Sequence, residues 1–241
     1  MPPKTEIPYF VELTEKERAF YEAVRLNLID ELKKQEGGSA KQNRIRIIAA
    51  ITKLRQAACN AKLIEPEADV PSAKLETFVQ LVQNLVAANH KALVFSQFVR
   101  HLDIVRPMLD ELGVSYQYLD GSTQRKDRAD AVEAFQKGDS NLFLISLKAG
   151  GLGLNLTRAD FVILLDPWWN PAVEDQASDR AHRIGQTKPV TIYRLIAKQT
   201  IEEKIIALHN EKRDLAEKIL SGTDTPGSIS AEELLKLITE S

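Results

Sequence analysis

A glutamine and two arginines recur at helical spacing in one short stretch of this sequence. Gln176, Arg180 and Arg183 stand at positions i, i+4 and i+7, so a helix would present all three on one face. A guanidinium keeps its charge at physiological pH, and its planar fork matches phosphate oxygens two at a time. The spacing therefore indicates a grip for a polyphosphate. The alternative is a solvated helix face, with the arginines paired locally to Asp175 and Asp179.

A glycine-rich loop, Lys-Ala-Gly-Gly-Leu-Gly-Leu-Asn at residues 148–155, follows an apolar run typical of a strand. Its three glycines allow backbone N–H groups to approach a ligand closely, and phosphate is the natural ligand of such a loop. The dinucleotide-binding fingerprint is incomplete, because Leu156 stands where its third glycine belongs. The loop predicts contact with phosphate of a nucleotide or of nucleic acid. The alternative is a tight strand-to-helix turn.

Both tryptophans of the chain are adjacent in the loop Asp-Pro-Trp-Trp-Asn-Pro, residues 166–171. Burying two large rings in a loop bracketed by prolines is difficult, so exposed aromatic surface is expected there. Such surface contacts nucleic acid or a partner domain. The alternative is that at least one ring covers the end of the sheet.

The sequence lacks the parts that hold Mg²⁺ and a nucleoside triphosphate. A phosphate-binding loop of the P-loop kind needs the dipeptide Gly-Lys, which occurs nowhere in the chain. No Asp-Glu-Ala-His-like box occurs either. The single cysteine and four histidines have no metal-ligand spacing, so no metal site is expected. The chain thus has arginines suited to phosphate but no phosphate-binding loop. This combination favours the interpretation that it supplies one half of a nucleotide site and that another domain supplies the other half.

The elements that position these loops alternate between strand and helix patterns. This alternation predicts parallel strands joined by right-handed crossovers, with helices on both faces of the sheet. Functional loops of such a sheet lie at the carboxyl ends of its strands. The predicted strands are residues 92–96, 116–119, 141–146, 161–165 and 190–196, and the predicted helices are about 98–112, 124–136 and 173–182.

Helical patterns flank this alternating region. Thr14 with Glu17 predicts a capping box that opens a helix, and a second helix is expected at about 40–59. Thr200 with Glu203 predicts a further capped helix, followed by a spacer and a short final helix. The apolar stripe of the capped helix is Ile201, Ile205, Leu208, Leu215 and Ile219; the spacer is 223–228, and Ser230 with Glu233 caps the last helix.

Net charge of −2 over 241 residues argues against a globally basic nucleic-acid binder. Residues 37–64, however, contain no acidic residue, and a helix there would place Lys41, Arg44 and Arg55 on nearly one face. The segment predicts either a basic patch for a phosphate backbone or a helix packed by apolar residues. The apolar residues of that alternative are Ile45, Ile48 and Leu54.

The chain shows no signal peptide and no apolar run long enough to span a bilayer. One cysteine, Cys59, cannot form an internal disulfide and fits a reducing compartment. We therefore expect a cytoplasmic protein without membrane contact, associated with the nucleoid if it is bacterial.

In order and spacing, the two loops and the segment with Gln176, Arg180 and Arg183 resemble motifs of a known family. The family is the second motor lobe of Swi/Snf-class ATPases of helicase superfamily two, particularly bacterial or archaeal members. The matching motifs begin at Lys148, Asp166 and Gln176, and the resemblance covers almost the whole chain. It implies an α/β, RecA-like parallel sheet flanked by helices, with an N-terminal helical protrusion and C-terminal helices. The implied divisions are an inter-lobe segment with the protrusion at 1–70, the lobe at 71–221, and a linker with a brace-like helix at 222–241.

The same resemblance implies roles for individual residues. Arg180 and Arg183 would be arginine fingers, Gln176 would help to position the γ-phosphate, and Gly151 and Gly153 would line the nucleotide cleft. ATP and Mg²⁺ would be bound mainly by a first lobe, which this sequence does not contain. The residues expected to contact DNA are Ser96, Gln97, Ser146, Lys148, Gly150 and Trp169.

The implied function is ATP-dependent translocation on double-stranded DNA, with little or no ATPase activity of this lobe alone. Its partners would be the first lobe, double-stranded DNA and a DNA-bound protein substrate. Two alternatives from other classes remain at this stage. One is a non-catalytic module that binds DNA or protein, and the other is a Rossmann-like enzyme that binds a nucleotide cofactor at Gly150–Gly153.

Overall fold

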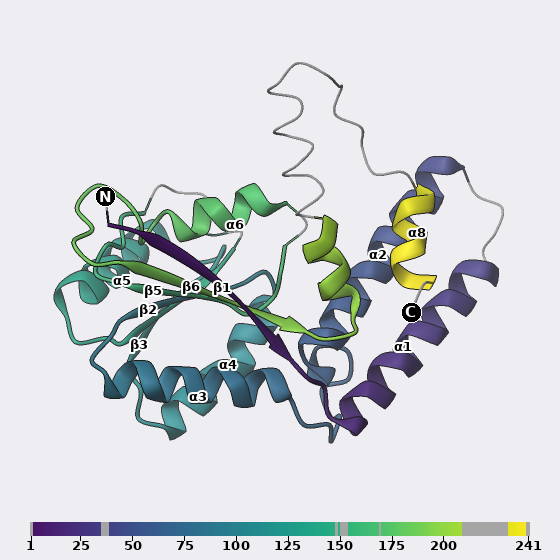
Figure 1. The fold of residues 1–241 in the computed structure, drawn as a ribbon, viewed down its shortest axis with the longest axis horizontal. Helices are drawn as coiled ribbons and strands as arrows, with labels where there is room; N and C mark the ends of the chain where they lie inside the picture. The colour runs from purple at the N-terminus through teal and green to yellow at the C-terminus, as the bar shows by residue number, and fades with distance from the viewer. Residues whose placement is uncertain are drawn as a thin grey trace, which may run out of the picture. The chain divides into compact units, whose positions relative to one another are not determined.

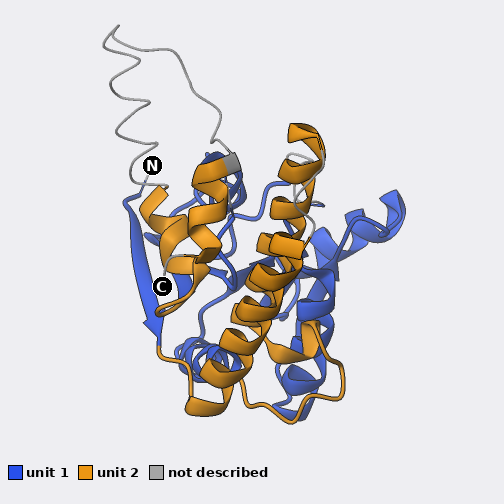
Figure 2. Ribbon diagram, turned by 90° about the vertical axis from the view of Figure 1, so that its right-hand side faces the viewer, with its two compact units in different colours: residues 1–11, 74–196 blue, residues 12–73, 197–241 orange. Residues whose placement is uncertain are grey.

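The computed structural model describes residues 2–34, 39–147, 149, 154–168, 170–208 and 231–239. The chain divides into two compact units, coloured separately in Figure 2. Unit 1 comprises residues 1–11 and 74–196, and unit 2 comprises residues 12–73 and 197–241. The units thus interleave along the chain, whereas the three regions expected from the sequence are consecutive.

Unit 1 is built on a six-stranded sheet with strand order β1-β6-β5-β2-β4-β3 (Figure 1). The inner pairs are parallel: Ala92 of β2 stands opposite Leu142 of β4 on one side and Phe161 of β5 on the other. Parallel pairing also joins β3 to β4 and β5 to β6. The strands are β1 (Lys4–Val11), β2 (Ala92–Ser96), β3 (Tyr116–Leu119), β4 (Leu142–Ser146), β5 (Phe161–Leu164) and β6 (Val190–Ala197).

Helices cover both faces of this sheet because neighbouring residues of each buried strand point to opposite sides. Leu93 and Phe95 of β2 belong to a core cluster with Phe135 of α5 (Arg125–Lys137) and Ala177 of α6 (Pro171–Ser178). Val94 belongs to the opposite cluster, with residues of α3 (Ala73–Ala87) and α4 (Val99–Glu111). The predicted α/β class, a parallel sheet flanked by helices, is confirmed.

The five predicted strands are present within two residues of their expected ends, but two elements were not predicted. β1 is an edge strand with Pro8 inside it, and most of its side chains are exposed. Edge strands tolerate proline and need no apolar alternation, so the hydrophobic pattern misses them. The other unpredicted element is α3.

Unit 2 is helical, with α1 (Glu15–Lys34), α2 (Ala40–Cys59), the 3₁₀ turn η1 (Ala61–Leu63), a helix over 201–208 and α8 (Ala231–Thr239). The predicted capping box at the start of α1 is confirmed. Glu17 donates its backbone N–H to the Thr14 hydroxyl at 3.3 Å, and its carboxylate accepts the Thr14 N–H at 2.8 Å.

The second predicted capping box, Thr200 with Glu203, is wrong, although the helix that it was expected to open does form. The hydroxyl of Thr200 accepts the N–H of Glu202, and the carboxylate of Glu203 accepts the N–H of Gln199 instead. Gln199 has φ of 53°, so the chain turns sharply before the helix and shifts the register of the cap by one residue.

The final helix, α8, packs within unit 2, where it contacts α2 and α1. Leu234 and Ile238 are buried, and Arg25 donates to the carbonyl oxygen of Ile238 at 3.1 Å. Leu215, Ile219, the 223–228 spacer and Ser230 lie outside the described residues.

The predicted basic face of α2 is only partly correct. Lys41 and Arg44 are exposed, but Arg55 is 2% exposed, and its neighbours in the C-terminal half of α2 are also buried. The apolar alternative is also only partly correct, since Leu54 is buried whereas Ile45 and Ile48 are exposed. Among the described residues, no helix has the length and apolar character that crossing a membrane requires.

Candidate functional site

Gln176, Arg180 and Arg183 line a single hollow of about 440 Å³ in unit 1. Two guanidinium groups and an amide thus face one space. The other lining residues are Leu154, Asp179, His182 and Ile184.

The continuous helix expected over 173–182 is wrong, since α6 ends at Ser178. The following backbone forms turns, in which Arg180 donates its N–H to the carbonyl of Ala177 and Ala181 donates to Ser178. The carbonyl of Arg180 accepts the N–H of Leu156 at 3.0 Å. The first two bonds lie within the segment and span three residues, and only the third comes from outside it. The three polar residues therefore converge through turns rather than along a helix face.

The side chain of Gln186 holds that turn in place. Its amide nitrogen donates to the carbonyl oxygens of Thr157, Ala159 and Ala181 at 2.8–3.0 Å, and its oxygen accepts the N–H groups of the next two residues. A buried amide that satisfies so many backbone groups fixes the local chain path. This role could not be predicted from the sequence, because three of the five bonds reach other segments or the start of the turn.

The edge strand also anchors the turn. His182 Nε2 lies 2.7 Å from the carbonyl oxygen of Pro2, so the ring donates to that oxygen. Asp179 forms an ion pair with Lys4 at 3.4 Å. The carboxylate closest in sequence to Arg180 is therefore engaged with β1.

Arg180 itself is 4% exposed. Within the described part of the chain, its Nε and Nη1 atoms have no hydrogen-bond partner. Burial, and next the charge of Arg183, lowers the pKa of the Arg180 guanidinium. Local pairing with Asp175 or Asp179 is therefore not the state of Arg180, and an anion entering the hollow would satisfy the group.

The chemistry of the hollow fits the end of a polyphosphate. Two guanidinium groups supply positive charge and paired donors, and the Gln176 amide supplies one more donor or acceptor. The single carboxylate of the lining, that of Asp179, is paired with Lys4. The lining is thus suited to phosphate oxygens rather than to a divalent cation.

Two predicted DNA contacts, Ser96 and Ser146, lie side by side at the carboxyl ends of β2 and β4. Both are buried, and their hydroxyls are used internally: Ser96 donates to Asp166, and Ser146 accepts the N–H of Ala149. Gln97 is 9% exposed and donates its N–H to Asp166 at 3.1 Å. In this conformation the serine hydroxyls are not presented to DNA, and these three contacts stay predictions.

The remaining predicted site residues, Lys148, Gly150, Gly151, Gly153 and Trp169, lie outside the described residues. The neighbouring ring of Trp168 is partly buried against the core on the α5 and α6 side of the sheet. One of the two tryptophans therefore covers the sheet, as the alternative interpretation of this loop expected.

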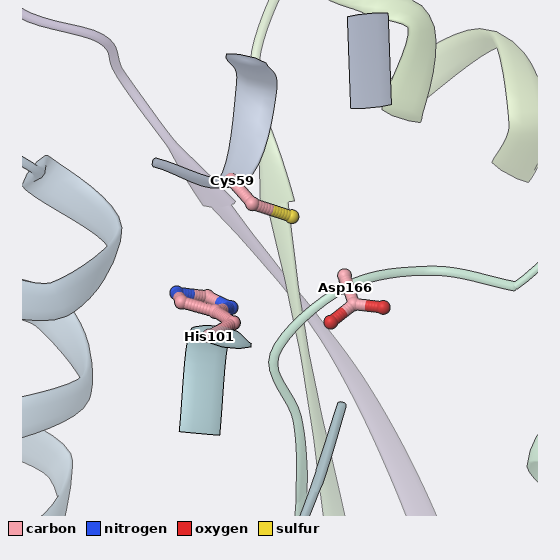
Figure 3. Close-up of side chains that lie close together, drawn as sticks. All are labelled: Cys59, His101 and Asp166. Atoms are coloured by element: carbon pink, nitrogen blue, oxygen red, sulfur yellow. The ribbon is translucent and has the colours of Figure 1, made fainter. Parts of the chain in front are cut away.

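Asp166 and His101 are two buried polar groups of unit 1 near the ends of its strands (Figure 3). Asp166 follows β5, and its carboxylate fixes the turn after β2 through the bonds to Ser96 and Gln97. His101 lies on α4, and within the described residues neither ring nitrogen has a hydrogen-bond partner. Cys59 belongs to unit 2, where its thiol donates to Glu202 at 3.4 Å.

Comparison with known proteins gives a consistent match. Residues 73–185 match the family model of the helicase conserved C-terminal domain. The putative ATP-dependent helicase/translocase YwqA of Bacillus subtilis is 34% identical, over 99% of this chain and 26% of its own length. The chain thus spans about a quarter of the length of the relatives that it matches.

Solved structures show the same likeness. The C-terminal domain of the Sulfolobus solfataricus SWI2/SNF2 ATPase is 30% identical with a TM-score of 0.77, and the match covers 99% of each chain. The ATPase core from the same organism in complex with double-stranded DNA is 32% identical with a TM-score of 0.79. That match covers 99% of this chain and 50% of the core. The predicted RecA-like lobe is confirmed.

Proposed function

The chain belongs to the SWI2/SNF2 ATPase family, in which it corresponds to the C-terminal domain, and we propose that it completes an ATPase site formed with an ATP-binding lobe. The dependence on a second lobe is supported by the missing P-loop and by the coverage of only half of the Sulfolobus core. The alternatives of a binding module and a Rossmann-like enzyme account for neither the family match nor the arginine hollow.

The observation that carries this proposal is the state of Arg180. Its guanidinium is almost fully buried beside a second arginine, and two of its nitrogens have no partner among the described residues. Leaving a buried charged donor unsatisfied is costly, so such a group is expected where a ligand supplies the missing acceptor. In the closed two-lobe enzyme, that acceptor would be the terminal phosphate of ATP.

When bound, ATP and Mg²⁺ would supply the phosphoryl group and a cation that offsets its negative charge. Arg180 and Arg183 would donate to the terminal phosphate and offset the charge that develops there, and Gln176 would orient that end of the site. Because both arginines belong to this lobe and the phosphate cradle to the other, hydrolysis would require closure of the two lobes.

The DNA-bound Sulfolobus core supports a second part of the proposal, contact with double-stranded DNA. The contact would involve the loops at the carboxyl ends of β2 and β4, through Ser96, Gln97, Ser146, Lys148 and Gly150, with Trp169 reaching toward a groove. Such contacts address the phosphate backbone and are independent of base sequence. Repeated closure and opening of the lobes would then move the enzyme along the duplex.

The test is DNA-stimulated ATP hydrolysis by the two-lobe protein with Arg180→Ala or Arg183→Ala. We expect kcat to fall by about 10³-fold or more, because arginine fingers typically contribute that much to phosphoryl transfer. The matched control is Arg158→Ala, which removes an exposed arginine outside the hollow. Unchanged hydrolysis in both finger variants would remove the catalytic assignment.

A further inference from the structure

Glu174 is a buried carboxylate that does not line the nucleotide hollow and is not among the residues proposed to contact DNA. It lies on α6, two residues before Gln176, and is 1% exposed. One carboxylate oxygen, Oε1, accepts the backbone N–H of Trp168 at 2.6 Å. The other, Oε2, accepts both Nε and Nη2 of Arg194 at 2.8 Å.

Arg194 connects this carboxylate to the sheet. It lies on β6 and is 9% exposed, and its Nη1 is 3.6 Å from a carboxylate oxygen of Glu6 on β1. Charged pairs of this kind have defined geometry, because the planar guanidinium matches the carboxylate plane. Glu174 therefore ties α6 to two strands and to the loop that precedes the helix.

The charges that act on Glu174 come from β6 and from the turn after β5. Burial raises the pKa of the Glu174 carboxyl, Arg194 of β6 opposes this, and Asp166 after β5 adds to it. A buried carboxylate without Arg194 would be unfavourable, so each group of the pair needs the other.

These interactions of Glu174 matter because α6 has only eight residues, and so short a helix depends on contacts with other elements for its stability and position. Ser178, at its last turn, donates its hydroxyl to the carbonyl of Glu174 at 2.9 Å. The chain then turns directly into Arg180, whose N–H bonds to Ala177 of the same helix. A shift of α6 would carry Gln176 and Arg180 with it.

We propose that Glu174, held by Arg194, is a positioning residue of the ATPase site that acts through Gln176 and Arg180. It does not line the hollow and does not touch the nucleotide. This inference rests on the proposed function, since it assigns Glu174 to the same site.

The first experiment compares Glu174→Gln with wild type in the two-lobe protein. A displacement of about 1 Å at a reacting group costs about 100-fold in rate, so we expect kcat for DNA-stimulated hydrolysis to fall about 10- to 100-fold. KM for ATP and the Kd for DNA should change by less than about threefold, because no binding contact is removed. An unchanged kcat would overturn the inference.

Two further variants separate positioning from loss of folding. Glu174→Asp keeps the charge and should recover part of the lost kcat, whereas a general packing role predicts a loss at least as large as in Glu174→Gln. The control Glu133→Gln removes an exposed carboxylate on α5 that pairs with Lys137, and should leave kcat unchanged. Melting curves identify the fraction of each variant that is folded, and kcat is normalised to it.

A double-mutant cycle that combines Glu174→Gln with Arg180→Ala separates the possibilities. The quantity measured is the single-turnover rate of ATP hydrolysis. If Glu174 acts through Arg180, the double variant hydrolyses ATP about as fast as Arg180→Ala alone. If the two losses multiply, Glu174 acts independently and the inference is wrong. If Arg180→Ala alone retains full activity, the proposed function fails first, so the two failures are distinguishable.

Discussion

Arg180 differs from other buried cations of unit 1 in its hydrogen bonding. Buried cations elsewhere in unit 1 are paired: Arg194 lies against Glu174, and the half-buried Lys91 donates to the carbonyls of Gly138 and Ser140. Arg180 has no such pairing within the described residues. Local violations of this kind are expected at sites where a ligand completes the interaction.

The sequence could single out Gln176, Arg180 and Arg183 as candidates, because their type and spacing are local properties. It could not identify Glu174 or Gln186 as their supports. Those side chains bond to β6, to the loop before α6 and to the segment after 156, which are distant or irregular in sequence. The burial of Ser96 and Ser146 could likewise not be predicted from the sequence, because it depends on Asp166 and on the sheet around the two serines.

A residue-scale prediction concerns His101, whose pKa burial lowers from 6.5 to about 3, with a further contribution from the charge of Lys74. Between these two pKa values the unfolded chain binds a proton that the folded chain excludes. Stability attributable to His101 is therefore present above pH 6.5 and is lost as the pH falls toward 3. From pH 6.5 to 4.5 this loss should amount to about 2 kcal/mol.

Urea unfolding of the lobe at a series of pH values checks this. His101→Leu should lose about 2 kcal/mol less than wild type over that interval, because it removes the titrating group. Val105→Ala on the same helix should lower the free energy of unfolding equally at every pH, since Val105 is buried and does not titrate. Parallel curves for His101→Leu and wild type would contradict the assignment.

At the scale of elements, strongly patterned segments were predictable and weakly patterned ones were not. β2 and β3 have the predicted ends, and the capping box places the start of α1. β1 was missed because an exposed edge strand lacks an apolar pattern. The helix α6 ends earlier than expected because the backbone after Ser178 forms turns, and Leu156 bonds to the carbonyl of Arg180 there. Tertiary hydrogen bonds overrode local periodicity at the turn that carries Arg180.

An element-scale prediction follows for Gln186, which fixes that turn. Gln186→Ala leaves the carbonyls of Thr157, Ala159 and Ala181 without this donor, so the free energy of unfolding should fall by about 2–3 kcal/mol. Chemical denaturation measures the change. Gln124→Ala serves as the control, because the Gln124 side chain makes no capping hydrogen bond, and it should change stability by less than about 0.5 kcal/mol. Equal effects of the two substitutions would show that the Gln186 bonds do not hold the turn.

For the molecule as a whole, the proposed function makes this lobe one half of an enzyme. The family and the RecA-like fold were predictable because the motifs occur in fixed order along one chain. The two compact units were not, since β1 joins the sheet of unit 1 while residues 197–241 belong with the N-terminal helices.

The lobe alone is therefore expected to hydrolyse ATP no faster than background, with or without duplex DNA, because it has no P-loop. Addition of a separately purified ATP-binding lobe should restore hydrolysis in proportion to complex formation. A steady-state phosphate-release assay checks both statements. DNA-stimulated hydrolysis by this lobe alone, at a rate unaffected by the second lobe, would contradict the composite site.

The role of Arg180 as an arginine finger is tested by the affinity of the two-lobe protein for ADP–aluminium fluoride–Mg²⁺, a mimic of the phosphoryl-transfer transition state. An arginine finger acts mainly in that state, so Arg180→Ala should weaken binding of the mimic by about 100-fold or more. Binding of ADP should change by less than about threefold, because ADP lacks the phosphoryl group that Arg180 would contact. Equal affinities of wild type and Arg180→Ala for the mimic would contradict the account.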